Sequence, residues 1–347
     1  IVPWNFPLMM ASWKLAPCLA AGNTAVFKPS EITPLSAIRL FALMEEAGFP
    51  PGVANLLLGS GASAGAELAE SMQVDKIAFT GGTETGRSIM RAAAGNIKKI
   101  SLELGGKSAN IVFADADLDV ATDYAAFGIY LNAGQVCASG SRLLVQESVY
   151  DRFMEKLVSK VRRIRVGNGM DPGTEMGPLV SQAHMEKVLS YIEIGKQEGA
   201  VLLTGGRRLT EGELAKGFFV EPTIFTDVTS DMRIYREEIF GPVLVVQKFR
   251  DEDEAVRLAN DSIYGLAGAV FTSDYETSMR VAKNVRVGVF WVNAYHPAFV
   301  EAPWGGYKQS GIGRELGTFG LEAYTEVKQL VFNHRPRPLG YYHWNRG

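Results

Sequence analysis

Residues 76–102 read KIAFTGGTETGRSIMRAAAGNIKKISL, and this pattern indicates the fold of the N-terminal part. The apolar run Lys76–Phe79 predicts a strand, Thr83–Ala94 a helix, and Lys98–Leu102 a second strand. Gly81 and Gly82 lie between the first strand and the helix, where the backbone has to turn sharply. A strand, a helix and a strand in this order predict two parallel strands joined by a crossover helix.

The same alternation continues upstream of this stretch. Strands are expected at Thr24–Phe27 and Val53–Leu58, and a helix near Ala62–Met72. A further helix should begin with Thr33 as its N-cap and Pro34 at its first position, and should end at Gly48. Residues 1–105 are therefore expected to form a doubly wound parallel sheet, of which only part is present.

A second α/β unit is expected from residue 106 to 309, followed by a C-terminal segment, residues 310–347. In this unit the helices are predicted at Leu118–Leu131, Val149–Ile164, Ala183–Glu198, Glu252–Asn260 and Tyr275–Val285. The strands are predicted at Ala109–Phe113, Leu143–Gln146, Val201–Leu203, Val243–Phe249, Ala267–Phe271 and Gly288–Val292.

Composition excludes several classes of protein. The chain of 347 residues has 47% hydrophobic and 21% charged residues and a net charge of −3, so it offers no basic excess for nucleic acid or an anionic membrane. The apolar stretch Phe6–Ala21 is interrupted by Lys14 and Pro17 and is too short to span a bilayer. The two cysteines, Cys18 and Cys137, cannot form a disulfide framework, which favours a reducing compartment and a cytoplasmic location.

Cys137 and Glu103 are the candidates for chemistry. Cys137 lies in the glycine-bracketed segment NAGQVCASGS, whereas Cys18 lies in an apolar helix that favours packing. Glu103 follows a predicted strand, at the edge where a doubly wound sheet binds ligands. On these residues alone, a buried structural thiol and a solvated loop acid remain equal alternatives. Metal-ligand spacing and a G-x-S-x-G motif are both absent, so neither a zinc enzyme nor that type of serine hydrolase is indicated.

A glycine-rich turn at Phe79–Gly86 can present backbone N–H groups to a pyrophosphate. It does not match the strict G-x-G-x-x-G pattern, and neither does the segment Gly59–Gly65. By its spacing alone the turn is therefore a weak signal for a dinucleotide.

Eight segments taken together are far more specific. From its first residues to about Val331, the chain resembles the aldehyde dehydrogenase superfamily. The matching segments, in the family's order, are PWNFP (3–7), KPSE (28–31), FTGGTETG (79–86), LELGGK (102–107), GQVC (134–137), EEIFGP (237–242), PWGGYK (303–308) and SGIGRE (310–315).

The resemblance implies a catalytic set. Cys137 is expected to be the nucleophile and Glu103 the general base that activates water. Asn5 would form an oxyanion hole with the backbone N–H of Cys137. Lys14 is carried over as a further catalytic residue. A free thiol with a pKa of ~8.5 is only about 3% ionised at pH 7, so a site that lowers this pKa increases the fraction of the reactive thiolate.

The resemblance also implies an NAD site in residues 1–105, completed by the second unit. Lys28 and Glu31 would bind the adenosine ribose and Glu238 the nicotinamide ribose, with Phe240 near the ring and Trp4 on the adenine side. Where the family's phosphate turn usually has Ser, this chain has Gly82, so a hydroxyl contact is lost. The remaining expected coenzyme residues are Ser30, Gly61, Gly65, Phe79, Thr80, Gly81 and Leu104.

For the substrate, the resemblance points to an aromatic cage near the entrance. Trp13 and Trp304 match cage positions, Phe6 and Ala298 are expected to lie close by, and residues 295–299 flank the same loop. Rings of this kind attract cations, so betaine aldehyde or a related cationic aldehyde is one candidate substrate. An ordinary apolar tunnel for aliphatic or aromatic aldehydes is the equal alternative.

The implied reaction oxidises an aldehyde to a carboxylic acid through a thiohemiacetal and a thioester on Cys137. A cofactor-independent ester or thioester hydrolase, and an impaired or non-catalytic member, stay open as alternatives. The match begins inside the family's coenzyme domain, so the chain reads as N-terminally truncated. A C-terminal strand at Thr325–Phe332 would lose its partner hairpin, and we therefore expect a homo-oligomer with altered contacts and weakened NAD binding.

Overall fold

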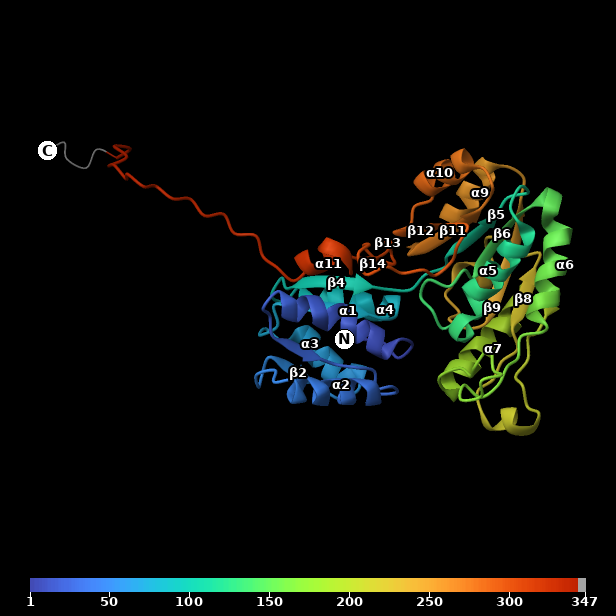
Figure 1. The fold of residues 1–347 in the computed structure, drawn as a ribbon, viewed down its shortest axis with the longest axis horizontal. Coiled ribbons are helices and arrows are strands. Elements are labelled where there is room, and N and C mark those ends of the chain that lie inside the picture. Colours follow the sequence, from blue (N-terminus) through green and yellow to red (C-terminus); the bar gives the residue numbers. More distant parts are fainter. Residues whose placement is uncertain (343–347) are drawn as a thin grey trace.

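The computed structural model describes residues 1–342 and shows two bodies, each with helices packed on both faces of a sheet (Figure 1). This confirms the expected α/β class and the doubly wound arrangement. The first body contains the N-terminal elements together with the C-terminal elements β14 (Gly311–Ile312) and α11 (Gly317–Glu322). The second body contains a seven-stranded sheet.

The sheet of the first body is parallel where the sequence predicted it. β1 (Ala25–Phe27) pairs in parallel with β2 (Ala54–Leu56), and β3 (Lys76–Thr80) pairs in parallel with β4 (Lys99–Glu103). Ile1 and Val2 lie between these two pairs: the amino group of Ile1 donates to the carbonyl of Ala78, and the N–H of Val2 donates to that of Lys28. The two pairs therefore form one continuous hydrogen-bonded layer.

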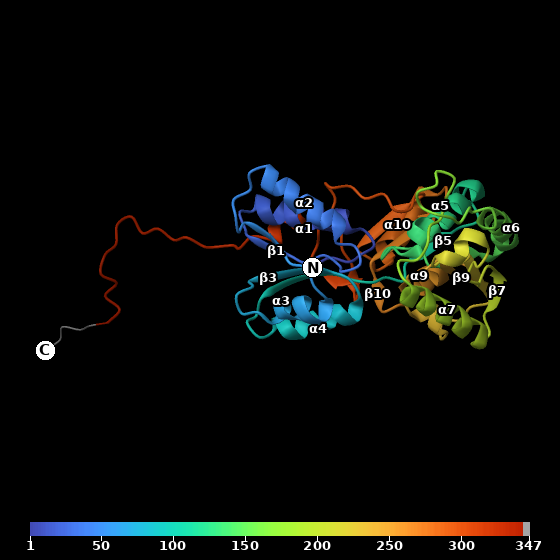
Figure 2. The same ribbon diagram turned by 90° about the horizontal axis from the view of Figure 1, so that it is seen from below.

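Helices cover both faces of this layer (Figure 2). On one face, α1 (Pro7–Ala20) and α2 (Leu35–Glu46) pack on β1 and β2 through a core that includes Leu15. On the other face, α3 (Ala66–Glu70) and α4 (Thr83–Ala93) pack on β3 and β4 through a core that includes Ile89. The turn Gly61–Gly65 before α3 is a short π-helix.

The predicted cap of α2 is wrong. The N-cap residue is Pro34, its first helical residue is Leu35, and no side chain caps the helix. The hydroxyl of Thr33 is buried without a hydrogen-bond partner in residues 1–342. The carbonyl of Pro34 accepts the N–H of Ile38 at 3.0 Å and is the first carbonyl of the helix to do so, so Thr33 lies one residue before the cap position.

The sheet of the second body has the strand order β12-β11-β5-β6-β9-β8-β7. All neighbours pair in parallel except β7 and β8, which are antiparallel. The sequence pattern did not predict β8, because its sequence TIFT has only two apolar residues and so forms no apolar run. The strands are β5 (Ala109–Val112), β6 (Arg142–Gln146), β7 (Val201–Thr204), β8 (Thr223–Thr226), β9 (Val243–Phe249), β11 (Ala267–Phe271) and β12 (Val289–Val292).

Two separate cores lie on the two faces of this sheet. The larger core involves α5 (Leu118–Tyr130), α6 (Tyr150–Val161) and α7 (Gln182–Gln197), together with the short α8 (Arg233–Arg236). The smaller core involves α9 (Glu252–Asn260) and α10 (Tyr275–Asn284). Helices on both faces bury both sides of the strands, which explains their nearly continuous apolar sequence.

After the second body the chain returns to the first. β13 (Tyr307–Lys308) pairs with β10 (Tyr264–Gly265), and then β14 pairs antiparallel with β4, so that Gly311 lies opposite Glu103. This return brings residues far along the chain to the end of β4, where Glu103 lies. Residues 1–342 contain no helix long and apolar enough to cross a membrane.

The expected strand Thr325–Phe332 is unpaired in the described chain, and its pairing with a neighbouring subunit stays a prediction. Thr325 and Glu326 still contact Lys99 of β4, but the residues that follow run away from both bodies (Figure 1), and side chains such as Val327 and Val331 are exposed. An extended segment becomes a strand only when a neighbouring backbone pairs with it, and no backbone of residues 1–342 does so here. The last five residues of the expected C-terminal segment, 343–347, lie outside the described part.

Candidate active site

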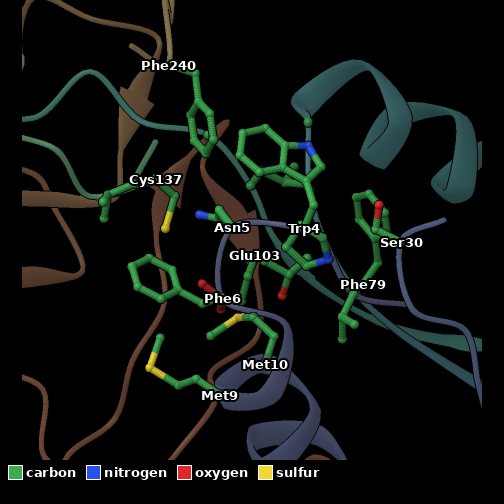
Figure 3. A pocket seen from close by; sticks show the side chains of 18 of the residues that line it. Trp4, Asn5, Phe6, Met9, Met10, Ser30, Phe79, Glu103, Cys137 and Phe240 are labelled. Atoms are coloured by element: carbon green, nitrogen blue, oxygen red, sulfur yellow. The ribbon is translucent and has the colours of Figure 1, made fainter. Parts of the chain in front are cut away.

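A cleft of about 590 Å³ collects most of the residues that the sequence predicted (Figure 3). Residues from both bodies line it, so neither body forms the site alone. The predicted residues along its walls are Trp4, Asn5, Phe6, Trp13, Lys28, Ser30, Glu31, Phe79, Thr80, Gly81, Gly82, Glu103, Leu104, Cys137, Glu238, Phe240, Ala298 and Trp304.

Cys137 lies half-buried in a turn after α5 that its surroundings hold tightly. Gly134 has a φ of +74°, and a Cβ there would lie 2.1 Å from the carbonyl oxygen of Gly241, so only glycine fits. On the other side of the turn, the buried hydroxyl of Tyr295 donates to the carbonyl of Ala138 at 3.0 Å. The thiol is thus held on a rigid turn that faces the cleft.

The surroundings raise the pKa of the Cys137 thiol instead of lowering it. Burial is the main cause, the carboxylates of Glu238 and Glu103 act in the same direction, and the pKa reaches about 12. The backbone N–H groups of Cys137 and Ala138 work against this shift. The thiol therefore has to lose its proton as it attacks, and it needs an acceptor close by.

Asn5 lines the same cleft as Cys137, and a hydrogen bond fixes its side chain. Its amide nitrogen donates to the carbonyl of Gln135 at 2.9 Å, two residues before Cys137. Figure 3 shows this amide pointing toward Cys137. An amide nitrogen has two hydrogens, so one stays free for an oxyanion after the bond to Gln135 has fixed the side chain.

Glu103 lies at the end of β4 and is 5% exposed. Neither of its carboxylate oxygens has a hydrogen-bond partner within residues 1–342. Burial raises the pKa of Glu103 well above its usual value, and the carboxylate of Glu315 adds to the shift, while Lys14 and Arg314 oppose it. A buried carboxylate with a raised pKa is a stronger base than an exposed one, which suits proton abstraction.

Lys14 does not line this cleft. Its ammonium group is buried behind it, 2.5 Å from Glu315 and 2.6 Å from the hydroxyl of Thr80. Glu315 does line the cleft, and its backbone N–H and carbonyl both pair with those of Trp304. Lys14 therefore acts on the site through its charge and through its contacts with Glu315 and Thr80.

The N-terminal body supplies groups that suit a dinucleotide. Gly82 is the N-cap of α4, and no side chain caps this helix, so its first N–H groups point out toward the cleft. A side chain at Gly81 would clash with the ring of Phe79, 2.4 Å away. Nearby, the Nζ atom of Lys28 lies 3.7 Å from the Oε2 atom of Glu31, and both groups can bind ribose hydroxyls. Gly61 and Gly65 do not line the cleft, although Gly65 packs against the stem of Lys28.

Glu238 faces the cleft from the second body. Its carboxylate accepts the N–H of Gly106 at 3.0 Å, and it lies so close to Gly105 that a Cβ there would be 2.2 Å away. Burial raises the pKa of Glu238 to about 7, while Lys187 and Lys107 oppose the shift. The ammonium group of Lys107 is buried without a hydrogen-bond partner in the described chain, and burial lowers its pKa to about 7.

Trp4 does not lie at the adenine side in this structure. Its ring packs edge-on against Phe240, with centroids 5.4 Å apart, and against His184 at 5.3 Å. Phe240 is the residue that the resemblance assigns to the nicotinamide end. We therefore expect Trp4 at the nicotinamide end, since it is there that its ring contacts Phe240 and His184.

The opposite end of the cleft is aromatic. The rings of Trp13 and Trp304 lie 5.5 Å apart and inclined at 64°, with Phe6 on the same wall. His296 also lines this end, and burial lowers its pKa to about 4, so it carries no charge at neutral pH. Phe299, in the predicted loop, does not line the cleft and is exposed.

Four titratable residues that line the cleft were not predicted as site residues: His184, Lys187, His296 and Glu315. Glu315 and His296 lie in segments that were singled out, but no role was given to them. His184 and Lys187 lie on a helix with an ordinary amphipathic pattern and gave no signal.

The model of the aldehyde dehydrogenase family matches residues 1–330, and the chain belongs to this family. It is 59% identical to betaine aldehyde dehydrogenase from Bacillus subtilis (strain 168) over 342 residues, which is 99% of this chain and 70% of that protein. It is 52% identical to an aldehyde dehydrogenase of Emericella nidulans, with 96% of this chain and 66% of that protein covered.

A solved structure agrees with this assignment. The betaine aldehyde dehydrogenase of Staphylococcus aureus, a P449M mutant in complex with NAD+, superimposes with a TM-score of 0.97 at 52% identity, covering 98% of this chain and 70% of that chain. The chain thus spans about two thirds of the length of the relatives that it matches.

Proposed function

We propose that this chain oxidises betaine aldehyde, or a related cationic aldehyde, to the carboxylic acid with NAD as coenzyme. One observation carries the proposal: Cys137, Asn5, Glu103 and Glu238 line a single cleft that has a dinucleotide-binding helix end along its wall. This combination serves both acyl chemistry on a thiol and binding of a ribose.

The residues suggest how the reaction runs. The sulfur of Cys137 attacks the aldehyde carbon while the thiol proton passes to water in the cleft. The electron pair of the C=O π bond moves to the oxygen, and the resulting oxyanion accepts hydrogen bonds from Asn5 and from the N–H of Cys137. NAD, when bound, accepts the hydride that leaves this carbon, and a thioester remains. Glu103 then takes a proton from water, which attacks the thioester and releases the acid.

NAD is expected to be preferred over NADP. Glu31 lines the cleft beside Lys28, and its carboxylate would repel a phosphate on the adenosine ribose. We expect Glu31→Gln to raise the efficiency with NADP relative to NAD by about tenfold. Initial rates with both coenzymes measure this ratio. Equal efficiencies with the two coenzymes in the unaltered chain would contradict the assignment.

The aromatic end of the cleft favours a cationic substrate. Each ring contributes about 0.5–2 kcal/mol to binding a cation, and Trp13 and Trp304 lie in the same wall. The test compares betaine aldehyde with 3,3-dimethylbutanal, in which carbon replaces the quaternary nitrogen. A higher kcat/KM for the cation supports the cage, and a higher value for the neutral isostere supports the apolar tunnel.

The same assay separates the other classes of function. Ester hydrolysis that persists without NAD, together with no NADH formation, would identify a hydrolase. A chain that neither binds NAD nor is labelled at Cys137 by an alkylating agent would be non-catalytic. Formation of NADH with a labelled Cys137 supports the dehydrogenase.

We further propose a homo-oligomer in the cytoplasm. The exposed apolar residues Leu330, Val331 and Phe332 suit pairing with another copy. Cys18 and Cys137 are both free thiols, which fits a reducing compartment. Light scattering and cell fractionation test these two statements.

A further inference from the structure

His184 begins a chain of contacts that leads to the coenzyme end of the cleft. It lies in the first turn of α7, and its Nε2 is 2.7 Å from the carbonyl oxygen of Phe240. A carbonyl oxygen only accepts, so Nε2 donates. Burial lowers the pKa of His184, and Lys187 adds to this, so the ring is neutral at neutral pH.

The hydrogen bond from His184 matters for Phe240 because the backbone of Phe240 is strained. Its φ is +62°, a left-handed conformation that bulky residues rarely adopt and that persists only when the surroundings enforce it. The next residue, Gly241, is pressed against α7: a Cβ there would lie 2.6 Å from Val188. The carbonyl of Gly241 abuts Gly134, in the turn that carries Cys137. The segment 240–241 is therefore packed between α7 and the nucleophile's turn.

The ring of His184 makes a second contact, which crosses the cleft. Trp4 belongs to the first body, and its ring meets His184 and Phe240 edge-to-face at interplanar angles of 66° and 89°. Such pairs add stabilisation beyond the area that they bury. Figure 3 shows Trp4 and Phe240 next to each other at the top of the cleft.

We propose that His184 is a positioning residue for the coenzyme: it holds the backbone of Phe240 and packs Trp4 against it, and so fixes the coenzyme end of the cleft. The proposal rests on the proposed NAD-linked function. His184 acts through Phe240 and Trp4, so its loss changes how tightly the coenzyme is held. The attack by Cys137 and the hydride step stay nearly unchanged once the coenzyme is bound.

The test uses His184→Ala and His184→Gln in the full chain. Glutamine keeps an N–H donor of similar reach, whereas alanine removes both the donor and the ring. NADH fluorescence gives the Kd, and stopped-flow displacement gives the dissociation rate. We expect His184→Ala to raise both about tenfold, the size of one lost hydrogen bond and ring contact. The pre-steady-state burst at saturating NAD should change by less than about twofold, and His184→Gln should recover most of the affinity.

A double variant supplies an independent measurement. Glycine adopts a φ of +62° without strain, so in a Phe240→Gly background the loss of His184 should have little further effect on the Kd. His334→Ala, in the exposed C-terminal segment, is the matched control and should leave the Kd unchanged.

The outcomes separate this proposal from the proposed function. An unchanged Kd and dissociation rate in His184→Ala overturn the proposal. Two other results would also overturn it. The first is a His184→Gln variant that binds NADH as weakly as His184→Ala while its Tm is unaltered. The second is a double variant in which the effects of His184→Ala and Phe240→Gly on the Kd are additive. An unaltered chain that binds no NADH refutes the proposed function instead.

Discussion

Cys137 and Cys18 differ in their surroundings more than in their chemistry. Cys18 is buried within α1, whereas Cys137 lies on the turn that faces the cleft. We expect Cys137→Ser to lower turnover by a factor on the order of 10³ or more, because a hydroxyl is a much weaker nucleophile, with little change in Tm. Cys18→Ser is the matched control and should keep near-normal activity. Loss of activity in Cys18→Ser alone would mean that the nucleophile is wrongly assigned.

Glu103 can be tested by separating the two halves of the reaction. Glu103→Gln keeps the shape of the side chain but cannot accept a proton, so hydride transfer should proceed while hydrolysis of the thioester stalls. The expected trace is a burst of about one NADH per active site followed by slow turnover. Stopped-flow absorbance measures the burst, and mass spectrometry detects the acyl group on Cys137. A variant with neither a burst nor a trapped acyl group would contradict the base role.

At the scale of elements, three segments meet around Glu103. The end of β4 carries Glu103, α1 carries Lys14, and the stretch between β14 and α11 carries Glu315. The pairing of β14 with β4 brings this last stretch into place. Because Glu315 raises the pKa of Glu103 while Lys14 lowers it, the arrangement of these elements sets the strength of the base.

A pH profile tests this arrangement. Glu103 has to be ionised to act as a base, so the hydrolysis rate should fall as the pH drops through its raised pKa. Glu315→Gln removes a negative charge and frees Lys14 from its ion pair, and both changes lower the pKa of Glu103. The acidic limb of the kcat profile should therefore move to lower pH.

The matched control for this shift is Glu322→Gln, an exposed residue of α11 in the same part of the chain. Its profile should coincide with that of the unaltered protein. An acidic limb that stays in place in Glu315→Gln, or that moves to higher pH, would show that Glu315 does not tune Glu103.

At the scale of the whole molecule, the site depends on how the two bodies face each other. Asn5, Lys28 and Glu103 come from the first body, whereas Cys137 and Glu238 come from the second. The rings of Trp4 and Phe240 meet across the cleft. We therefore expect any change in the relative position of the bodies to alter both coenzyme binding and the distance between Cys137 and Glu103.

The C-terminal segment is the part of the molecule that we expect to pair with another copy of the chain. Val331 and Phe332 are 81% and 74% exposed, and the backbone around them pairs with no strand in the described chain. We expect the double variant Val331→Lys, Phe332→Lys to shift the chain toward the monomer, because the charges disfavour pairing of strands. Light scattering measures the mass, and Leu339→Lys, farther along the segment, is the control. An identical mass for the double variant and the unaltered chain would exclude this segment as the interface.

Much of the fold follows from the sequence alone, because strands and helices are local in origin. Apolar periodicity placed most helices and strands to within a few residues, and caps such as Asp251 and Ser181 are local signals too. Motif segments pointed to Cys137 and Glu103 before any geometry was known. Glycines such as Gly134 could be recognised as places where the backbone bends, since the freedom of φ is a property of the residue itself.

Only the tertiary structure decided which distant residues act together. Lys14 read as a catalytic residue, yet it lies behind the cleft in an ion pair with Glu315, 301 positions along the chain. His184 gave no signal, yet it holds the strained backbone of Phe240. Thr325–Phe332 read as a strand, yet a strand needs a partner that this chain does not place beside it. Charge, burial and pairing of this kind depend on what packs against a residue, and packing between distant segments leaves no trace in a local pattern.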